Sequence, residues 1–183
     1  MDYSAAVLAG GKSKRFGADK ALYLYKEKPL IKWVLDSFID SNDIFIVANQ
    51  DYPTFDTKIY SDIIGSLGPL SGIYTGLSYA KNDWLAVAAC DMPFLNSEFW
   101  RDLFAYAHGY QAVVIKTEHG LEPLAAFYHK TSLETIKQEI KKQEYSVQKL
   151  LAKLELKTID IAQIKQDSKV LSNFNYLKDF KNL

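Results

Sequence analysis

Two glycines and a group of cations stand close together near the start of the chain, in "LAGGKSKRFGADKAL", residues 8–22. Gly10 and Gly11 have no Cβ, so backbone N–H groups beside them can approach an anion closely. Four cations follow, among them Arg15 and Lys20, and could neutralise such an anion. These residue types indicate a phosphate site. An ordinary strand-to-loop turn with a solvated basic surface is the alternative.

The stretch matches neither of two well-known phosphate-binding motifs. Gly11-Lys12-Ser13 resembles the end of a Walker A loop, but Ala6 stands where that motif requires an earlier glycine. The adjacent pair Gly10-Gly11 also lacks the G-x-G-x-x-G spacing of a dinucleotide fingerprint. The residues therefore predict an anion site without selecting its ligand.

Asp91 directly follows the apolar run "WLAVAAC". Burying an unpaired charge is costly, so we expect this carboxylate to emerge at a strand end and meet a cation. Mg²⁺ is commonly held by one or two carboxylates plus substrate phosphates, which makes Asp91 a candidate metal ligand. A local turn or helix cap, helped by Pro93, is the alternative. Cys90 is expected to pack as a small hydrophobic residue rather than act as a nucleophile.

Asn49 and Asp62 are two further polar residues at expected strand ends. The Asn49 amide offers a donor and an acceptor, which could read a base edge or a ribose, or could cap a turn. Asp62 could accept hydrogen bonds from a base or form a turn. Neither residue alone decides between these roles.

Short β-rich runs alternate with helical patterns along the chain. The expected strands are 4–10, 43–49, 56–62, 83–91, 111–117 and 123–129. The expected helices are 29–39 with Pro29 in its first turn, 71–80, 97–107 with Ser97 as its cap, 132–143 and 146–154. This alternation predicts an α/β fold whose mostly parallel sheet has helices on both faces. Ligands bind beyond the carboxyl ends of such strands, where the candidate residues lie.

Composition narrows the classes of function. The 183 residues predict one domain spanning 1–183, and 22 Lys and Arg balance 22 Asp and Glu, which argues against nucleic-acid binding. Cys90 is the only cysteine, so an internal disulfide and a cysteine metal cluster are excluded and a reducing cytosol fits. No signal peptide and no apolar run of about 20 residues is present, which predicts a cytoplasmic protein without a membrane span. The three histidines are scattered, and no H-E-x-x-H or G-x-S-x-G motif occurs.

Joined in order, these motifs resemble the signature of nucleotidyltransferases with a Rossmann-like sheet. "LAGG" and "DKAL" are most similar to the molybdenum cofactor guanylyltransferases. Further matches are Asn49, "GPLSG" at 68–72, "CDMPFL" at 90–95, "EPLAAFY" at 122–128 and "NFNYLKDF" at 173–180. The last resembles the family's N-x-N-T-P-x-D-L ending, with Tyr176-Leu177 in place of Thr-Pro. The resemblance covers nearly the whole chain.

The resemblance implies a three-layer Rossmann-like nucleotidyltransferase fold and a transfer of GMP from GTP to the terminal phosphate of molybdopterin, with release of pyrophosphate. It implies that Asp91 binds Mg²⁺, that Arg15 contacts the triphosphate, and that both act with Lys20 in catalysis. The implied nucleotide-binding residues are Leu8, Ala9, Gly10, Gly11, Lys20, Asn49, Asp62 and, through the metal, Asp91. The pterin is expected near 68–72 and 122–128. A molybdoenzyme or a molybdenum-insertion protein is the implied protein partner.

Two other readings compete with this one. A cytidylyltransferase for the same pterin, or another small-molecule nucleotidyltransferase, would share most of these residues. A non-catalytic protein that binds nucleotide or cofactor and delivers it to a partner is a different class. The joint presence of Lys20 and Asp91 argues against delivery alone, because binding does not require a metal at the α-phosphate.

Overall fold

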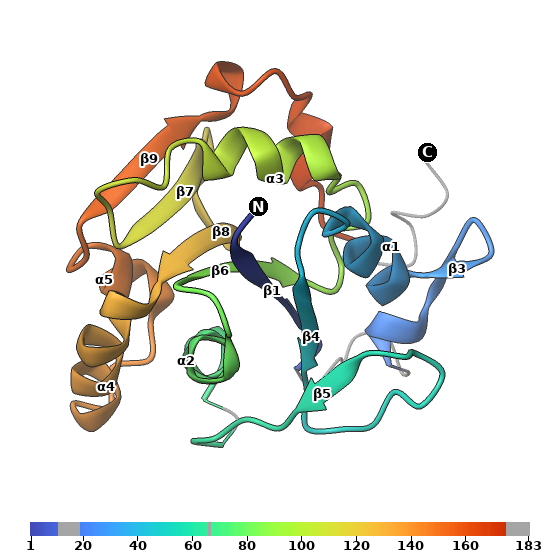
Figure 1. The fold of residues 1–183 in the computed structure, drawn as a ribbon, viewed down its shortest axis with the longest axis horizontal. Helices are drawn as coiled ribbons and strands as arrows, with labels where there is room; N and C mark the ends of the chain where they lie inside the picture. Colours follow the sequence, from blue (N-terminus) through green and yellow to red (C-terminus); the bar gives the residue numbers. More distant parts are fainter. Residues whose placement is uncertain (11–18, 66, 175–183) are drawn as a thin grey trace.

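A seven-stranded sheet forms the centre of the molecule (Figure 1). The computed structural model describes residues 1–10, 19–65 and 67–174. The strand order is β5-β4-β1-β6-β8-β7-β9. The strands are β1 (Tyr3–Leu8), β4 (Asp43–Val47), β5 (Lys58–Tyr60), β6 (Trp84–Ala89), β7 (Ala112–Thr117), β8 (Gly120–His129) and β9 (Leu156–Asp160). The first four expected strands end within two residues of their observed ends.

All strands of this sheet except β8 run in one direction. Strands β5, β4, β1 and β6 pair in parallel, and β9 pairs in parallel with β7. Strand β8 is antiparallel to both β6 and β7, because a two-residue turn after Thr117 leads directly into Gly120. The prediction of a mostly parallel sheet is confirmed, and the start of β8 lies at the same edge as the carboxyl ends of the other strands.

Helices cover both faces of the sheet, as Figure 1 shows. Helices α1 (Leu30–Ser37) and α3 (Ser97–Phe104) pack on the face that carries Ala5 and Val7 of β1. Helices α2 (Pro69–Tyr79), α4 (Leu133–Lys141) and α5 (Val147–Leu151) pack on the face that carries Ala6 and Leu8. This alternation along one strand is what a strand buried on both faces requires. In the described ranges, no helix is both long and apolar enough to cross a bilayer.

Helix α2 approaches the sheet unusually closely because glycines face the strands. A Cβ built on Gly76 would lie 2.8 Å from Cδ2 of Leu85. A Cβ built on Gly72 would lie 3.0 Å from Cδ1 of Leu8, the last residue of β1. The absence of a side chain at these two positions therefore sets the height of α2 above the strand ends.

The structure also contains elements that the sequence patterns did not predict. A hairpin joins β2 (Leu24–Tyr25) to β3 (Lys28–Pro29), with Lys26 and Glu27 both at positive φ. Strand β9 was likewise not expected. The short 3-10 helices are η1 (Lys20–Leu22), η2 (Lys130–Ser132), η3 (Ile161–Gln163) and η4 (Ser168–Leu171).

Two local expectations were wrong by one residue. Asn96 rather than Ser97 caps α3, since its Oδ1 accepts the Phe99 N–H at 2.8 Å. Pro29 does not lie in the first turn of α1 but precedes the helix, where its extended backbone belongs to β3. Both helices, α1 and α3, still form in the predicted segments.

Glu139 on α4 provides a pH-dependent test of the fold. Its side chain is 2% exposed and accepts hydrogen bonds from Lys153 and, at 3.1 Å, from Lys142. The Lys153 bond is the main cause that holds the pKa of Glu139 below its ordinary value. A lowered carboxyl pKa contributes stability above the ordinary pKa, and that stability disappears as pH falls through the folded-state pKa.

We expect Glu139→Gln to lower the melting temperature at pH 7, because a neutral amide attracts the charged Lys142 and Lys153 side chains less strongly than a carboxylate does. The difference from the unchanged protein should narrow as the pH falls through the lowered folded-state pKa of Glu139, because the carboxyl group then also becomes neutral. Thermal unfolding followed by circular dichroism at several pH values measures both effects. An equal difference at pH 7 and pH 3 would contradict the assignment.

Candidate functional site

The carboxyl ends of four neighbouring strands form one edge of the sheet. Backbone hydrogen bonds hold the residues just beyond these ends together. They run from Ala9 N–H to Val47 C=O at 3.0 Å, from Ala48 N–H to Tyr60 C=O at 3.0 Å, and from Cys90 N–H to Leu8 C=O at 3.1 Å. The start of the glycine-rich stretch and the residues before Asn49 and Asp91 are thereby fixed relative to one another.

Lys20 and Asp91 meet at this edge although 71 positions separate them in the chain. Lys20 Nζ donates to Asp91 Oδ2, and the two side chains are 14% and 17% exposed. Lys20 begins η1, whose N-cap is Asp19. The expectation that a cation meets the carboxylate at the end of β6 agrees with this pair.

The second oxygen of Asp91 is left open. Asp91 Oδ1 is buried and has no hydrogen-bond partner among the described residues. Leaving a buried carboxylate oxygen without a partner is costly, and a bound cation removes that cost. Within the described ranges, no three His, Cys, Asp or Glu side chains gather into a metal-binding group. The donor set therefore fits a divalent ion that takes its other ligands from substrate phosphates and water.

Glu122 is a second carboxylate at this edge. It lies near the start of β8 and reaches the edge because β8 runs antiparallel to its neighbours. Burial is the main cause that raises the pKa of Glu122; its Oε1 accepts the Leu124 N–H, which lowers the pKa, and the charge of Asp91 raises it further. The sequence had placed Glu122 only in the segment expected near the pterin.

Asn49 and Asp62 contact each other. Asn49 Nδ2 donates to Asp62 Oδ2 at 3.1 Å, and the Asp62 N–H donates to Asn49 Oδ1 at 2.9 Å. This pair ties the end of β4 to the end of β5 through residues 13 positions apart in the chain, rather than through a local turn. Asp62 Oδ1 is buried without a hydrogen-bond partner in the described part of the chain. A role of either residue toward a nucleotide stays a prediction.

Cys90 packs against the apolar core beneath this edge. Burial raises the pKa of its thiol strongly, and the neighbouring charge of Asp91 adds to that shift. The thiolate is the reactive form of cysteine, and here it is disfavoured. The expectation that Cys90 is a packing residue agrees with this environment.

The first residues of the C-terminal motif, 173–180, contact the candidate site. Phe174 N–H donates to the backbone C=O of Asp91 at 2.9 Å. The Phe174 ring lies 5.1 Å from the ring centre of Tyr25 and 5.6 Å from that of Phe94. Gly11, Arg15 and the motif beyond Phe174 lie outside the described residues, and their expected roles stay predictions.

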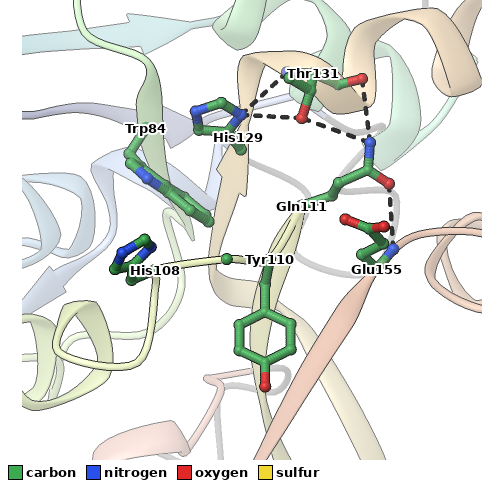
Figure 2. Close-up of a pocket in the computed structure, with 8 residues that line it drawn as sticks. Trp84, His108, Tyr110, Gln111, His129, Thr131 and Glu155 are labelled. Atoms are coloured by element: carbon green, nitrogen blue, oxygen red, sulfur yellow. Dashed lines mark hydrogen bonds between the residues drawn. The ribbon is translucent and has the colours of Figure 1, made fainter.

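Two cavities lie at opposite edges of the sheet. One of about 490 Å³ borders the candidate site and is lined by Asp19, Leu22, Tyr23 and Leu24. The other, of about 460 Å³, is shown in Figure 2 and is lined by Trp84, His108, Gly109, Tyr110, Gln111, His129, Thr131 and Glu155.

The cavity in Figure 2 is remote from the candidate chemistry. Trp84 begins β6 and His129 ends the antiparallel β8, so both lie at the amino edge of the parallel strands. Gln111 contacts Thr131, and the Glu155 N–H donates to the Gln111 side chain (Figure 2). These hydrogen bonds join connecting segments of the fold. We therefore place the functional site at the opposite edge, around Lys20 and Asp91.

Comparison with known proteins identifies a matching family. Residues 5–159 match the family described as the MobA-like NTP transferase domain. A probable molybdenum cofactor guanylyltransferase from Clostridium perfringens strain SM101 is 35% identical over 188 residues, which cover 98% of this chain and 95% of the relative.

Solved structures share the fold. Molybdopterin-guanine dinucleotide biosynthesis protein A from Archaeoglobus fulgidus superposes with a TM-score of 0.84 at 23% identity, covering 97% of this chain and 95% of its own. The 2-C-methyl-D-erythritol 4-phosphate cytidylyltransferase from Thermus thermophilus superposes with a TM-score of 0.75 at 12% identity, covering 99% and 96%. The fold is thus common to transferases of different nucleotides.

Proposed function

Since the chain belongs to the MobA-like NTP transferase family and is a nucleotidyltransferase of molybdenum cofactor biosynthesis, we propose that it transfers GMP from GTP to molybdopterin. The observation that carries the proposal is the Lys20–Asp91 pair with its open Asp91 Oδ1. Residues 1–183 would act as one catalytic domain in the cytoplasm. A molybdoenzyme or a molybdenum-insertion protein would receive the product.

The reaction joins two phosphates. A terminal phosphate oxygen of molybdopterin attacks the α-phosphorus of GTP and forms a new P–O–P bond. The bond from the α-phosphorus to the oxygen that bridges it to the β-phosphate breaks, and its electron pair leaves with pyrophosphate. The attacking monoester is largely a dianion at neutral pH, because its second pKa is about 6, so no strong general base is required.

The main difficulty is electrostatic, because one anion must approach another. Phosphoryl-type transfer is promoted mainly by positioning and by cations around the transferred group. Lys20 would bind the triphosphate, and the pair that it forms with Asp91 places its ammonium group at the strand ends. Arg15 would add a second positive charge. The backbone of Leu8, Ala9, Gly10 and Gly11, with Asn49 and Asp62, would bind the remaining nucleotide groups.

Asp91 would hold Mg²⁺, with the substrate phosphates supplying the other ligands. Bound Mg²⁺ would supply charge stabilisation at the α-phosphate and the departing pyrophosphate. Without nucleotide, Asp91 Oδ2 pairs with Lys20, and with nucleotide the open Oδ1 would hold the metal. Repulsion between the two cations would then release the Lys20 ammonium group toward the phosphates.

Choice of guanine over cytosine rests on similarity to named guanylyltransferases rather than on the fold. Pyrophosphate release measured with GTP, CTP, ATP and UTP, each with and without molybdopterin, tests it. We expect release with GTP and molybdopterin together, and little with either alone. Release with CTP in preference to GTP would identify the cytidylyltransferase instead.

The same assay separates catalysis from delivery. A delivery protein would bind GTP or the finished cofactor saturably and release no pyrophosphate. Isothermal titration with GTP beside the release assay distinguishes the two outcomes. Replacement of molybdopterin by a sugar phosphate is the control for a transferase with a different acceptor.

A further inference from the structure

The side chain of Gln50 connects two separate parts of the candidate site. Gln50 Nε2 donates to Asp19 Oδ2 at 2.5 Å and to the Tyr52 hydroxyl at 2.6 Å. The Tyr52 hydroxyl in turn lies 3.4 Å from the Ala9 C=O and donates to it. One amide therefore joins Asp19, which precedes Lys20, to Ala9, which follows β1.

Both ends of this connection are firmly held. The Tyr52 side chain is 1% exposed, and its burial raises the pKa of the phenol well above its ordinary value. The phenol therefore keeps its proton and stays a hydrogen-bond donor. Asp19 uses its other oxygen, Oδ1, to accept the Ala21 N–H at 3.0 Å and so caps η1. Both Asp19 oxygens are thus engaged, which fixes the first turn that carries Lys20.

We propose that Gln50 is a positioning residue that acts through Asp19 and Tyr52. It holds Lys20 and the backbone at Ala9 in one arrangement before a nucleotide arrives. This inference rests on the proposed function, in which Lys20 binds the triphosphate and the Ala9–Gly10 backbone binds other groups of the nucleotide. Groups that are already fixed lose less conformational entropy on binding, so the connection favours nucleotide affinity.

Gln111 offers a matched comparison within the same chain. Its amide also joins distant segments, since Oε1 accepts the Glu155 N–H at 3.1 Å and Nε2 contacts the Thr131 carbonyl at 3.4 Å. Figure 2 shows these contacts, which lie at the opposite edge of the sheet, where β6 begins and β8 ends. If such amides contributed only to the stability of the fold, substitution of Gln50 and substitution of Gln111 would have similar effects on GTP binding. A positioning role would affect nucleotide binding at Gln50 alone.

The test compares Gln50→Ala, Gln50→Glu and Gln111→Ala with the unchanged protein. For Gln50→Ala we expect the Kd for GTP with Mg²⁺ to rise about fivefold to tenfold, while kcat at saturating substrate changes much less. Gln50→Glu keeps the side-chain size but sets a carboxylate against Asp19, so its Kd should rise further. Gln111→Ala should leave the Kd unchanged. Melting temperatures of the Gln50 variants should stay close to that of the unchanged protein.

Hydrogen exchange supplies a measurement without nucleotide. The Ala21 amide should exchange faster in Gln50→Ala, because Asp19 then loses one of its two restraints. An unchanged GTP Kd together with unchanged Ala21 exchange would overturn the inference. So would an equal loss of GTP affinity in Gln111→Ala, or a Gln50→Glu variant that binds GTP normally. If the unchanged protein binds GTP but releases no pyrophosphate, the proposed transfer fails while these comparisons still decide the role of Gln50.

Discussion

Asp91→Asn is expected to lower kcat for pyrophosphate release by roughly a thousandfold, the upper range for removal of one preorganised charged or polar group at a reacting centre. The amide keeps the size of the side chain but carries no negative charge, so it is a poor ligand for Mg²⁺. It also loses the ion pair with Lys20. Steady-state pyrophosphate release with GTP, Mg²⁺ and molybdopterin measures the effect.

The fold should survive the Asp91→Asn substitution. The bond that Phe174 makes at this position uses the backbone C=O of Asp91, which is unaffected. Asp36→Asn is a matched control, because Asp36 also pairs with lysines, Lys28 and Lys32, but lies on α1. The control should keep its activity. Near-normal turnover in Asp91→Asn would rule out the proposed metal role.

Lys20→Ala is expected to weaken GTP binding by about tenfold to a hundredfold, since a hydrogen bond to a charged group contributes roughly 1.5–3 kcal/mol. Turnover should fall as well, because charge on the triphosphate is then less well neutralised. Titration calorimetry with GTP and the pyrophosphate assay measure the two effects. Lys32→Ala, which removes an exposed partner of Asp36, is the control and should change neither.

Lys20→Ala is expected to strengthen metal binding, although it weakens GTP binding. Without nucleotide, Lys20 occupies Asp91 and competes with a cation for it. Lys20→Ala removes this competitor, so the nucleotide-free variant should bind a divalent ion more tightly than the unchanged protein. Mn²⁺ binding followed by electron paramagnetic resonance tests this. Weaker Mn²⁺ binding in the variant would show that Asp91 does not change partners as proposed.

Several features could be predicted because they depend on neighbours in the sequence. Asp91 ends a continuous apolar run, and that alone places its carboxylate at a strand end near a cation. The alternation of strands and helices likewise predicts a covered, mostly parallel sheet.

Other features depend on contacts that no local pattern contains. The β2–β3 hairpin turns at Lys26 and Glu27, which lack the Asn-Gly or Asp-Gly types that normally indicate such a turn. The mutual hydrogen bonds of Asn49 and Asp62 exist because β4 and β5 are neighbours in the sheet. The position of Glu122 at the same edge of the sheet as Asp91 requires the reversed direction of β8.

Because β8 runs opposite to its neighbours, the two sides of the site are formed by different ends of strands. In the proposed function, the nucleotide side consists of residues that follow parallel strands. The other side is the beginning of β8, which follows a two-residue turn from β7. Changes in the length of that turn would alter the acceptor side while the nucleotide side stays in place. If the acceptor binds at this side as proposed, exchange of residues 115–124 between relatives is expected to change the acceptor and to leave the nucleotide unchanged.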